Sequence, residues 1–244
     1  MTPFHNICSG KVLTVPANQR AFSWGVSQVD DLISDLKLAG TQAHYLGTVI
    51  VSRARGVNDF QDDNLATTAE FVLEDGQQRI TTLMIFANEL RKAMLKRKVH
   101  SLHADKLDDF IFVKKGHKYP RIKNEQNNLN EYFNFILTDT PAPPAERIAA
   151  MNSLDLVKNH LQKFVHDLSD DELLGWMQSL SNRALLVWVD LEANGTNLNR
   201  YLTFDAINQQ PPHNLLKLLQ LHHLGVEKHI RGTEGLAQIY QCLC

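Results

Sequence analysis

The feature that most constrains this chain is the polar stretch Asp75-Gly76-Gln77-Gln78-Arg79, which separates two strongly apolar segments. The segment before it, Phe71-Val72-Leu73, is predicted to be a short buried strand, and apolar residues recur at helical spacing after it. The polar stretch therefore lies where a strand passes into a helix. The first N–H groups of a helix lack intrahelical acceptors and the helix dipole is positive there, so such a junction favours an anion such as phosphate.

The residue types in this stretch fit two interpretations. Gly76 allows a tight turn or close approach of a ligand, Arg79 offers a planar fork of donors for phosphate, and Asp75 can hold a metal ion or position a proton. In the simpler interpretation the stretch is an ordinary strand-to-helix turn, with Asp75 as the helix N-cap and two solvated glutamines. Both remain open on these residues alone.

The composition is typical of a soluble globular protein without the overall positive charge that would indicate a nucleic-acid partner, although a local basic patch stays possible. The 244 residues are 43% hydrophobic, enough for one or two domains with a substantial core, and the formal net charge is -2. Cys8, Cys242 and Cys244 lack the paired spacing of a zinc ribbon or disulfide framework, so we expect a reducing cytoplasm. Since neither a signal-peptide core nor an apolar run of about 18 residues occurs, we expect no membrane partner.

The first hundred residues follow the pattern β, α, β, loop, β, α, which is typical of a compact α/β domain. The pattern consists of a strand at 11–15, a helix with Ser27 as N-cap, a strand at 45–51, a polar and mobile insertion at 52–69, a strand at 71–73 and the following helix.

Beyond residue 92 the predicted elements are mainly helical, with a capping box at Ser169-Asp170-Asp171-Glu172. Helices are predicted near 105–113, 127–137 and 148–165, and a buried strand at 184–191 returns to the N-terminal sheet. We therefore expect an α+β fold, with residues 1–95 as a small mixed-sheet domain and residues 96–244 as an appended, mainly helical region.

A second polar segment, Val15 to Trp24, contains Gln19-Arg20 next to a strand end and taken alone fits an ordinary surface loop. Followed by a helix, by Tyr45-Leu46-Gly47-Thr48-Val49 and by the Asp75 to Arg79 stretch, it resembles the DGQQR family. That family is the ParB/sulfiredoxin-like N-terminal domain of GmrSD-type (type IV) restriction enzymes and of the phosphorothioate-sensing SspE defence proteins. The resemblance spans roughly residues 8 to 210 and implies a ParB/sulfiredoxin-like fold for residues 1–95.

The resemblance implies a nucleotide-hydrolysing module of a defence system against foreign or modified phage DNA. It assigns GTP or ATP hydrolysis to Asp75, Gln77, Gln78 and Arg79. It assigns nucleotide binding to Gln19, Arg20, Gly76 and Thr81. As a hypothesis, both arginines neutralise phosphate oxygens, Asp75 holds Mg²⁺ or another divalent metal, and one of the two glutamines orients the attacking water.

Two departures from the family pattern concern the rest of the chain. After Asn208 the sequence continues Gln209-Gln210-Pro211-Pro212-His213, so we expect an atypical or truncated C-terminal end. The family commonly carries an HNH nuclease domain, for which the chain has no space, so the nuclease is expected to be a partner.

Three other motifs are weak or missing. The segment His117-Lys118-Tyr119-Pro120 lacks the sequence context of an HNH nuclease, and no carboxylate or cysteine pattern completes a metal site with the histidines 222, 223 and 229. No Walker motif occurs.

Basic residues concentrate locally at 91–98 and 114–123, where solvated surfaces are the simpler interpretation. If these residues line one surface, they bind DNA through salt-sensitive phosphate contacts, and the candidates are Lys96, Arg97, Lys115 and Lys118. The preferred function is an NTP-hydrolysing module coupled to a separate DNA nuclease. Two alternatives stay open: a direct metal-dependent DNA endonuclease of ParB-like type, and a non-catalytic sensor of modified DNA or partner-binding remnant.

Overall fold

The structure is a computed structural model, and it describes residues 1–38, 42–54, 56, 59–126, 128–139 and 147–191. The strands are β1 (Thr2–Pro3), β2 (Lys11–Val15), β3 (His44–Arg53), β4 (Phe60–Gln61), β5 (Thr67–Asp75), β6 (Phe112–Lys115), β7 (His117–Pro120), β8 (Ile122–Asn124) and β9 (Ala184–Asp190). The helices are α1 (Phe4–Cys8), α2 (Val26–Leu38), α3 (Gln77–Arg97), α4 (Ser101–Ile111), α5 (Leu129–Thr138), α6 (Ala149–His166), α7 (Asp170–Gln178) and the π-helical turn η1 (Ser179–Arg183).

A mixed sheet organises these elements in the order β1-β9-β3-β5-β2-β8, with β4 paired to β5. Strand β2 runs parallel to both β5 and β8, whereas β3 runs antiparallel to β5 and parallel to β9. The carboxyl ends of β2, β5 and β8 therefore meet at one edge of the sheet, where β3 begins. Hairpin β6-β7 forms a separate two-stranded sheet.

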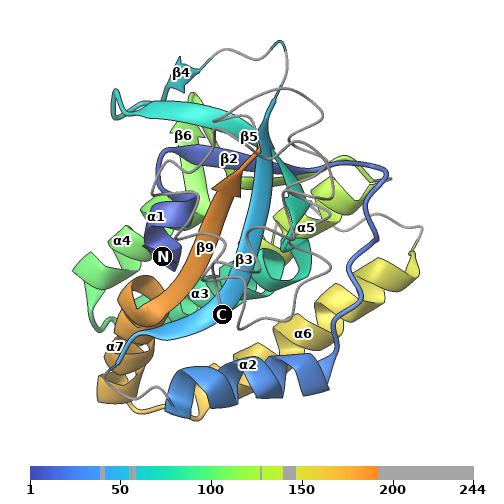
Figure 1. Cartoon of the computed structure of the whole chain (residues 1–244). Helices are drawn as coiled ribbons and strands as arrows, with labels where there is room; N and C mark the ends of the chain where they lie inside the picture. The colour runs from blue at the N-terminus through green and yellow to red at the C-terminus, as the bar shows by residue number, and fades with distance from the viewer. Residues whose placement is uncertain (39–41, 55, 57–58, 127, 140–146, 192–244) are drawn as a thin grey trace, which may run out of the picture. The chain divides into compact units, whose positions relative to one another are not determined.

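Helix α3 is the centre of the hydrophobic core, because residues all around it are buried. Its buried positions run without interruption from Ile80 to Leu90, a pattern that marks a core helix rather than an amphipathic surface helix. It packs against α4, α5, α6 and α7, and Figure 1 shows it behind β3 and β9. Helices α2 and α6 lie side by side in the same view, joined by a hydrogen bond of 2.7 Å between Nε2 of His160 and Oδ1 of Asp30.

The expected α+β class is confirmed, and so is the return of the last strand to the N-terminal sheet. Strand β9 pairs with β3 from His44 opposite Ala184 to Val51 opposite Asp190. The capping box is also confirmed, since Ser169 Oγ accepts a hydrogen bond from the N–H of Glu172 and the Glu172 carboxylate accepts one from the N–H of Ser169. The division into regions 1–95 and 96–244 stays a prediction.

Three local predictions were wrong. Helix α2 begins at Val26, so Ser27 lies in its first turn and is not the N-cap. Within the insertion expected at 52–69, β3 continues to Arg53 and β4 pairs with β5. The buried carboxylate of Asp62 orders the turn between these strands by accepting from the N–H groups of Asn64 and Ala66, each at 2.9 Å. The predicted helix near 105–113 ends at Ile111 and continues as β6.

The C-terminal end after Asn208, including its histidines and Cys242 and Cys244, lies outside the described residues, as does the part of the resemblance beyond residue 191. In the part that is described, none of the helices combines the length and the apolar character needed to cross a membrane.

Candidate functional site

The two polar segments singled out in the sequence meet at the sheet edge where the parallel strands end. Val15 of β2 pairs with Asn124 of β8, and Thr14 of β2 pairs with Val72 of β5, three residues before the end of that strand. The loops that follow the three strands therefore leave the sheet together. In open sheets with parallel strands, ligands bind in the crevice outside these carboxyl ends.

Gly76 makes the sharp turn from β5 into α3. It is the N-cap of the helix, with φ of 96°, a left-handed conformation that L side chains rarely adopt. A β-carbon here would also lie 3.1 Å from the carbonyl oxygen of Thr48 and 3.3 Å from Cγ2 of Val49. The simpler interpretation with Asp75 as N-cap is therefore wrong: Asp75 ends β5, and no side chain caps this helix.

The first turn of α3 presents free backbone donors at this edge. The N–H of Ile80 donates to the carbonyl of Gly76 at 3.0 Å and is the first bond of the helix. Among the described residues, no acceptor contacts the preceding N–H groups of Gln77, Gln78 and Arg79. Free N–H groups at the positive end of a helix dipole form a favourable position for an anion.

Gln78 attaches the other polar loop to the helix. Its Oε1 accepts from the N–H groups of Ser23 at 2.9 Å and Trp24 at 3.3 Å, and its Nε2 donates to the carbonyl of Ala21 at 3.1 Å. The side chain is buried, so these bonds satisfy an amide that would otherwise be costly to bury. This geometry makes Gln78 a residue that positions the loop, and leaves its amide committed to that loop.

Gln19 connects the ends of all three parallel strands. Its Nε2 donates to the carbonyl of Glu74 at 2.9 Å, and its Oε1 accepts a long bond of 3.5 Å from Nε2 of Gln77. Its backbone carbonyl accepts from Nε2 of Gln126, which follows β8. Gln126 Oε1 is buried without a hydrogen-bond partner in the described part of the chain.

Arg79 lies in the first turn of α3 with its guanidinium against the start of β3. A β-carbon at Gly47 would be 2.7 Å from Nη1 and 2.8 Å from Cζ of Arg79. Burial lowers the pKa of Arg79, and the neighbouring Asp75 and Tyr45 oppose this change. The described residues offer the guanidinium no hydrogen bond, so a partly desolvated cation extends from the same helix turn that carries the free N–H groups.

Asp75 is the carboxylate at this edge and is half-buried. Its neighbour Glu74 is engaged elsewhere, with its Oε1 accepting from Ser52 Oγ at 2.6 Å. Among the described residues no group of three or more acidic, histidine or cysteine side chains could hold a metal ion. A single carboxylate can hold Mg²⁺ only when phosphate oxygens and water molecules supply most of the other ligands.

The remaining predicted nucleotide-binding residues differ in how far their side chains are exposed to solvent. Arg20 is exposed, and no contact of its guanidinium is described. Thr81 is 8% exposed within α3, so its side chain is largely withdrawn from solvent. The roles assigned to these residues and to Asp75, Gly76, Gln77, Gln78 and Arg79 stay predictions.

The four predicted DNA-binding cations lie on helix α3 and on hairpin β6-β7 and have different surroundings. Arg97, at the end of α3, donates to the carbonyls of Leu168, His166 and Val165 and pairs with Asp170 at 3.2 Å. Lys96 is exposed beside it. On hairpin β6-β7, the exposed Lys115 lies 4.1 Å from the ring centroid of Phe60.

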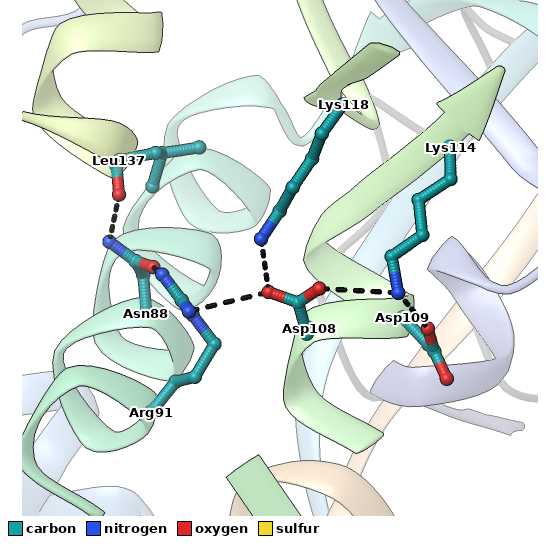
Figure 2. A network of polar contacts seen from close by, with 7 residues as sticks. All are labelled: Asn88, Arg91, Asp108, Asp109, Lys114, Lys118 and Leu137. Carbon is teal, nitrogen blue, oxygen red and sulfur yellow. Dashed lines mark hydrogen bonds and ion pairs between the residues drawn. The ribbon is translucent and has the colours of Figure 1, made fainter. Parts of the chain in front are cut away.

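Lys118, the fourth of these cations, belongs to a polar network between α3, α4 and the hairpin. Figure 2 shows that the carboxylate of Asp108 contacts Lys118, Arg91 and Lys114. Arg91 also donates to Asn88, whose amide donates to the carbonyl of Leu137 at 2.8 Å. Lys118 is therefore neutralised within the fold, which leaves Lys96 and Lys115 as the freer cations of the four.

Sequence reasoning missed two residues of the candidate site. Gly47 was noted only as part of the resemblance, although a glycine inside a predicted strand can signal close approach of another group. Gln126 had no detectable signal, because it follows the three-residue strand β8, which is too short to be recognised from its pattern.

Comparison with known protein families gave a match over most of the chain. A family model described as GmrSD restriction endonuclease, N-terminal domain, matches residues 4–211. A search among curated proteins gave no match for the chain.

Proposed function

The chain belongs to the family of GmrSD restriction endonuclease N-terminal domains, and from that membership we propose that its loop edge binds and hydrolyses a nucleoside triphosphate. As a family member it is a module of a restriction-type defence system. In the proposal, hydrolysis controls a DNA nuclease that acts on foreign or modified DNA. One observation supports this proposal most directly. Arg79, the free N–H groups of α3 and the Gln19 loop all lie at the edge of the sheet where the parallel strands end.

Phosphate binding follows from the charge and donor arrangement. The N–H groups of Gln77, Gln78 and Arg79 have no acceptor in the described structure, and the Arg79 guanidinium is partly desolvated. A phosphate placed here would accept hydrogen bonds from the helix and from the planar guanidinium fork. Such groups stabilise the charge of a transferring phosphoryl group without reorganising during the reaction.

The two glutamines have separate roles in this proposal. Gln78 holds the 21–24 loop through three hydrogen bonds, so it determines the shape of the site. Among the described residues, the Gln77 side chain makes only the 3.5 Å contact with Gln19, and its amide is available to orient the water that attacks the terminal phosphorus. This assignment narrows the earlier choice between the two glutamines to Gln77.

Asp75 is the proposed Mg²⁺ ligand, and the metal would neutralise phosphate charge when bound. Asp75 also lies close enough to influence the charge of Arg79. We infer that the Asp75 carboxylate attracts the guanidinium and helps to orient it before the nucleotide binds. The nucleotide then replaces this long-range attraction with direct hydrogen bonds.

Release of inorganic phosphate from each NTP, with and without modified DNA, tests the proposal. Asp75→Ala and Arg79→Ala should each lower turnover by about 100-fold or more, as the loss of a charge-stabilising group does. Arg53→Ala is the matched control, because Arg53 is an exposed arginine in a surface ion pair with Asp59. Wild-type turnover in both variants would contradict the assignment.

The same variants separate the alternative functions. Metal-dependent nicking of plasmid DNA by the pure protein, abolished by Asp75→Ala, would favour the direct endonuclease. Nucleotide binding without turnover in the wild type would favour a sensor or partner-binding role. Phosphate release that depends on Arg79 supports the proposed NTPase.

A further inference from the structure

A cavity of about 780 Å³ lies at the end of the sheet opposite the Asp75 loop. It is bordered by Gly10 just before β2 and by Thr67 at the start of β5, with walls from α1, α4, β6, α7 and η1. The proposed nucleotide site lies where β2 and β5 end, so the cavity is a separate location. Several of its polar side chains are buried and only partly satisfied.

Arg121 supplies a buried cation to the cavity wall. The residue is 6% exposed, and its guanidinium donates from Nε to the carbonyl of Asp109 at 2.9 Å and from Nη1 to the carbonyl of Lys11 at 3.2 Å. These two bonds fix its orientation. The guanidinium carries further N–H groups, and within the described residues they have no acceptor.

Asp62 and Ser181 add buried groups of different chemistry. Asp62 is 7% exposed, and its Oδ1 accepts two backbone hydrogen bonds, whereas no donor to its Oδ2 is found in the described part of the chain. Ser181 is 5% exposed, and its Oγ is buried without a hydrogen-bond partner among the described residues. Ser181 lies in η1, and π-helical turns of this kind occur frequently at functional sites.

Asp62 and Arg121 influence each other electrostatically but form no ion pair. Opposite charges that border one cavity without contact can both be satisfied by a ligand between them. Hydrogen bonds to an ionised donor or acceptor are stronger than neutral ones, so a ligand that bonds to both side chains would be favoured. It needs acceptors for Arg121 and hydroxyl donors for Asp62.

The remaining charges of the cavity favour an anion. Lys106 is exposed at the cavity, and within the described residues it has no ion-pair partner. His103 and His5 also line the cavity. Lys114 is already paired with Asp108 and Asp109. The apolar side chains of Phe110, Phe112 and Met177 complete the lining and suit the carbon skeleton of an organic molecule.

We propose that this cavity binds a small organic anion that carries hydroxyl groups. Its phosphate or carboxylate would contact Arg121 and Lys106, and its hydroxyl groups would donate to Asp62 and pair with Ser181. The Asp62 turn comes from the β4-β5 connection and Ser181 from η1, so the ligand would bridge segments far apart in the chain.

Calorimetric titration of the full chain with glycerol 3-phosphate tests the proposal. Glycerate tests the carboxylate form, glycerol lacks the anion, and inorganic phosphate lacks the carbon-bound hydroxyl groups. We expect saturable binding of glycerol 3-phosphate or glycerate, at least about tenfold tighter than that of glycerol or inorganic phosphate. Absence of saturable binding by both organic anions overturns the proposal, and so does equal binding of inorganic phosphate.

Variants then assign the binding to this cavity. Ser181→Ala should weaken binding about threefold to tenfold while raising the melting temperature, because it removes a buried unsatisfied hydroxyl. Lys106→Ala should weaken binding similarly without changing stability, since Lys106 is exposed. Lys96→Ala and Arg79→Ala are controls outside the cavity and should leave the affinity unchanged. Unchanged affinity in both Ser181→Ala and Lys106→Ala overturns the assignment.

Discussion

The guanidinium of Arg79 lies directly against the backbone of Gly47, so closely that a β-carbon at position 47 would be 2.7 Å from Nη1. The contact joins the first turn of α3 to the start of β3, and only glycine leaves room for it. Gly47 also has φ of 117°, a conformation that L side chains rarely adopt. This one position therefore combines a backbone requirement with a steric one, and both serve the placement of the proposed phosphate-binding arginine.

Gly47→Ala should destabilise the protein and displace Arg79. Gly116→Ala is the matched control, because Gly116 has φ of 68° but no atom within contact of an added β-carbon. Both variants place an alanine at positive φ, which costs at least about 1–2 kcal/mol, and Gly47→Ala also collides with the flexible end of the Arg79 side chain. Thermal unfolding should therefore show destabilisation of both variants, whereas only Gly47→Ala should displace Arg79 and lose NTP turnover. Equal effects in the two variants would remove the steric argument.

Gln78→Ala should loosen the 21–24 loop and weaken nucleotide binding more than turnover. The substitution removes three hydrogen bonds between α3 and that loop, at a cost of about 1–3 kcal/mol in the free energy of unfolding. Gln77→Ala should do the opposite, with stability within about 0.5 kcal/mol of wild type and kcat lowered at least about tenfold. Denaturant unfolding and steady-state kinetics measure the two effects. The same profile for both variants would contradict the separate roles.

Arg97→Ala should destabilise the protein, whereas Lys96→Ala should not. Arg97 donates to three carbonyls near the end of α6 and pairs with Asp170, so its loss should cost about 1–3 kcal/mol. Lys96 is exposed, and its removal should change stability by less than about 0.5 kcal/mol.

DNA-binding measurements test the candidate phosphate contacts of Lys96 and Lys115. If Lys96 and Lys115 contact phosphates, Lys96→Ala and Lys115→Ala should each reduce the salt slope of DNA affinity by about 1. Affinities measured over a range of salt concentrations decide this. An unchanged slope in both variants would exclude them from the DNA contact.

Glu89→Gln should stabilise the protein at neutral pH and not at acid pH. Glu89 is 3% exposed, and burial raises its pKa although Lys92 lies 3.5 Å away and opposes the rise. Because the pKa is higher in the folded state, Glu89 contributes stability that is present below its unfolded pKa of about 4.3. That contribution is lost as the pH rises through the folded value.

Denaturant unfolding at several pH values checks the Glu89 prediction. The variant should gain about 1 kcal/mol at neutral pH, and the gain should vanish in acid. Glu125→Gln serves as an exposed control with little effect at any pH. Destabilisation of Glu89→Gln at neutral pH would mean that the pair with Lys92 outweighs the cost of burial.

Asp108→Asn should destabilise the network between α3, α4 and hairpin β6-β7. One largely buried carboxylate contacts Arg91, Lys114 and Lys118, so its loss leaves three cations close together with only Asp109, which pairs with Lys114, to offset them (Figure 2). We expect a loss of about 1–3 kcal/mol at low salt. Added salt should recover part of it by screening the repulsion. A loss that does not depend on salt would mean that hydrogen bonding, rather than charge, is responsible.

Local patterns in the sequence were sufficient for most elements of the fold. The β-formers at 45–51 and 184–191, the helical spacing after Arg79 and the capping box at Ser169 predicted elements that the structure contains. The short strands β1, β4 and β8 could not be predicted, because two or three residues have no detectable period. The pairing of strands decides these elements.

In the candidate site, too, some features could be predicted from the sequence and others only from the structure. The residue types at Asp75 to Arg79 and at Gln19 were sufficient to predict a polar, anion-binding chemistry. They left open whether Asp75 caps the helix, and they did not distinguish Gln77 from Gln78. The structure distinguishes them, because the Gln78 amide is occupied by backbone groups of residues 21–24.

Short residue patterns were enough to predict the mixed α+β architecture, the strand-to-helix junction at Gly76 and the family to which the chain belongs. Each of these properties depends on residues that are close together in the sequence. The place of Gln126 in the site, the room that Gly47 makes for Arg79 and the second polar cavity at the other end of the sheet are visible only in the folded chain. Strand order and direction bring these residues together across long stretches of chain, and local propensity carries no information about that pairing.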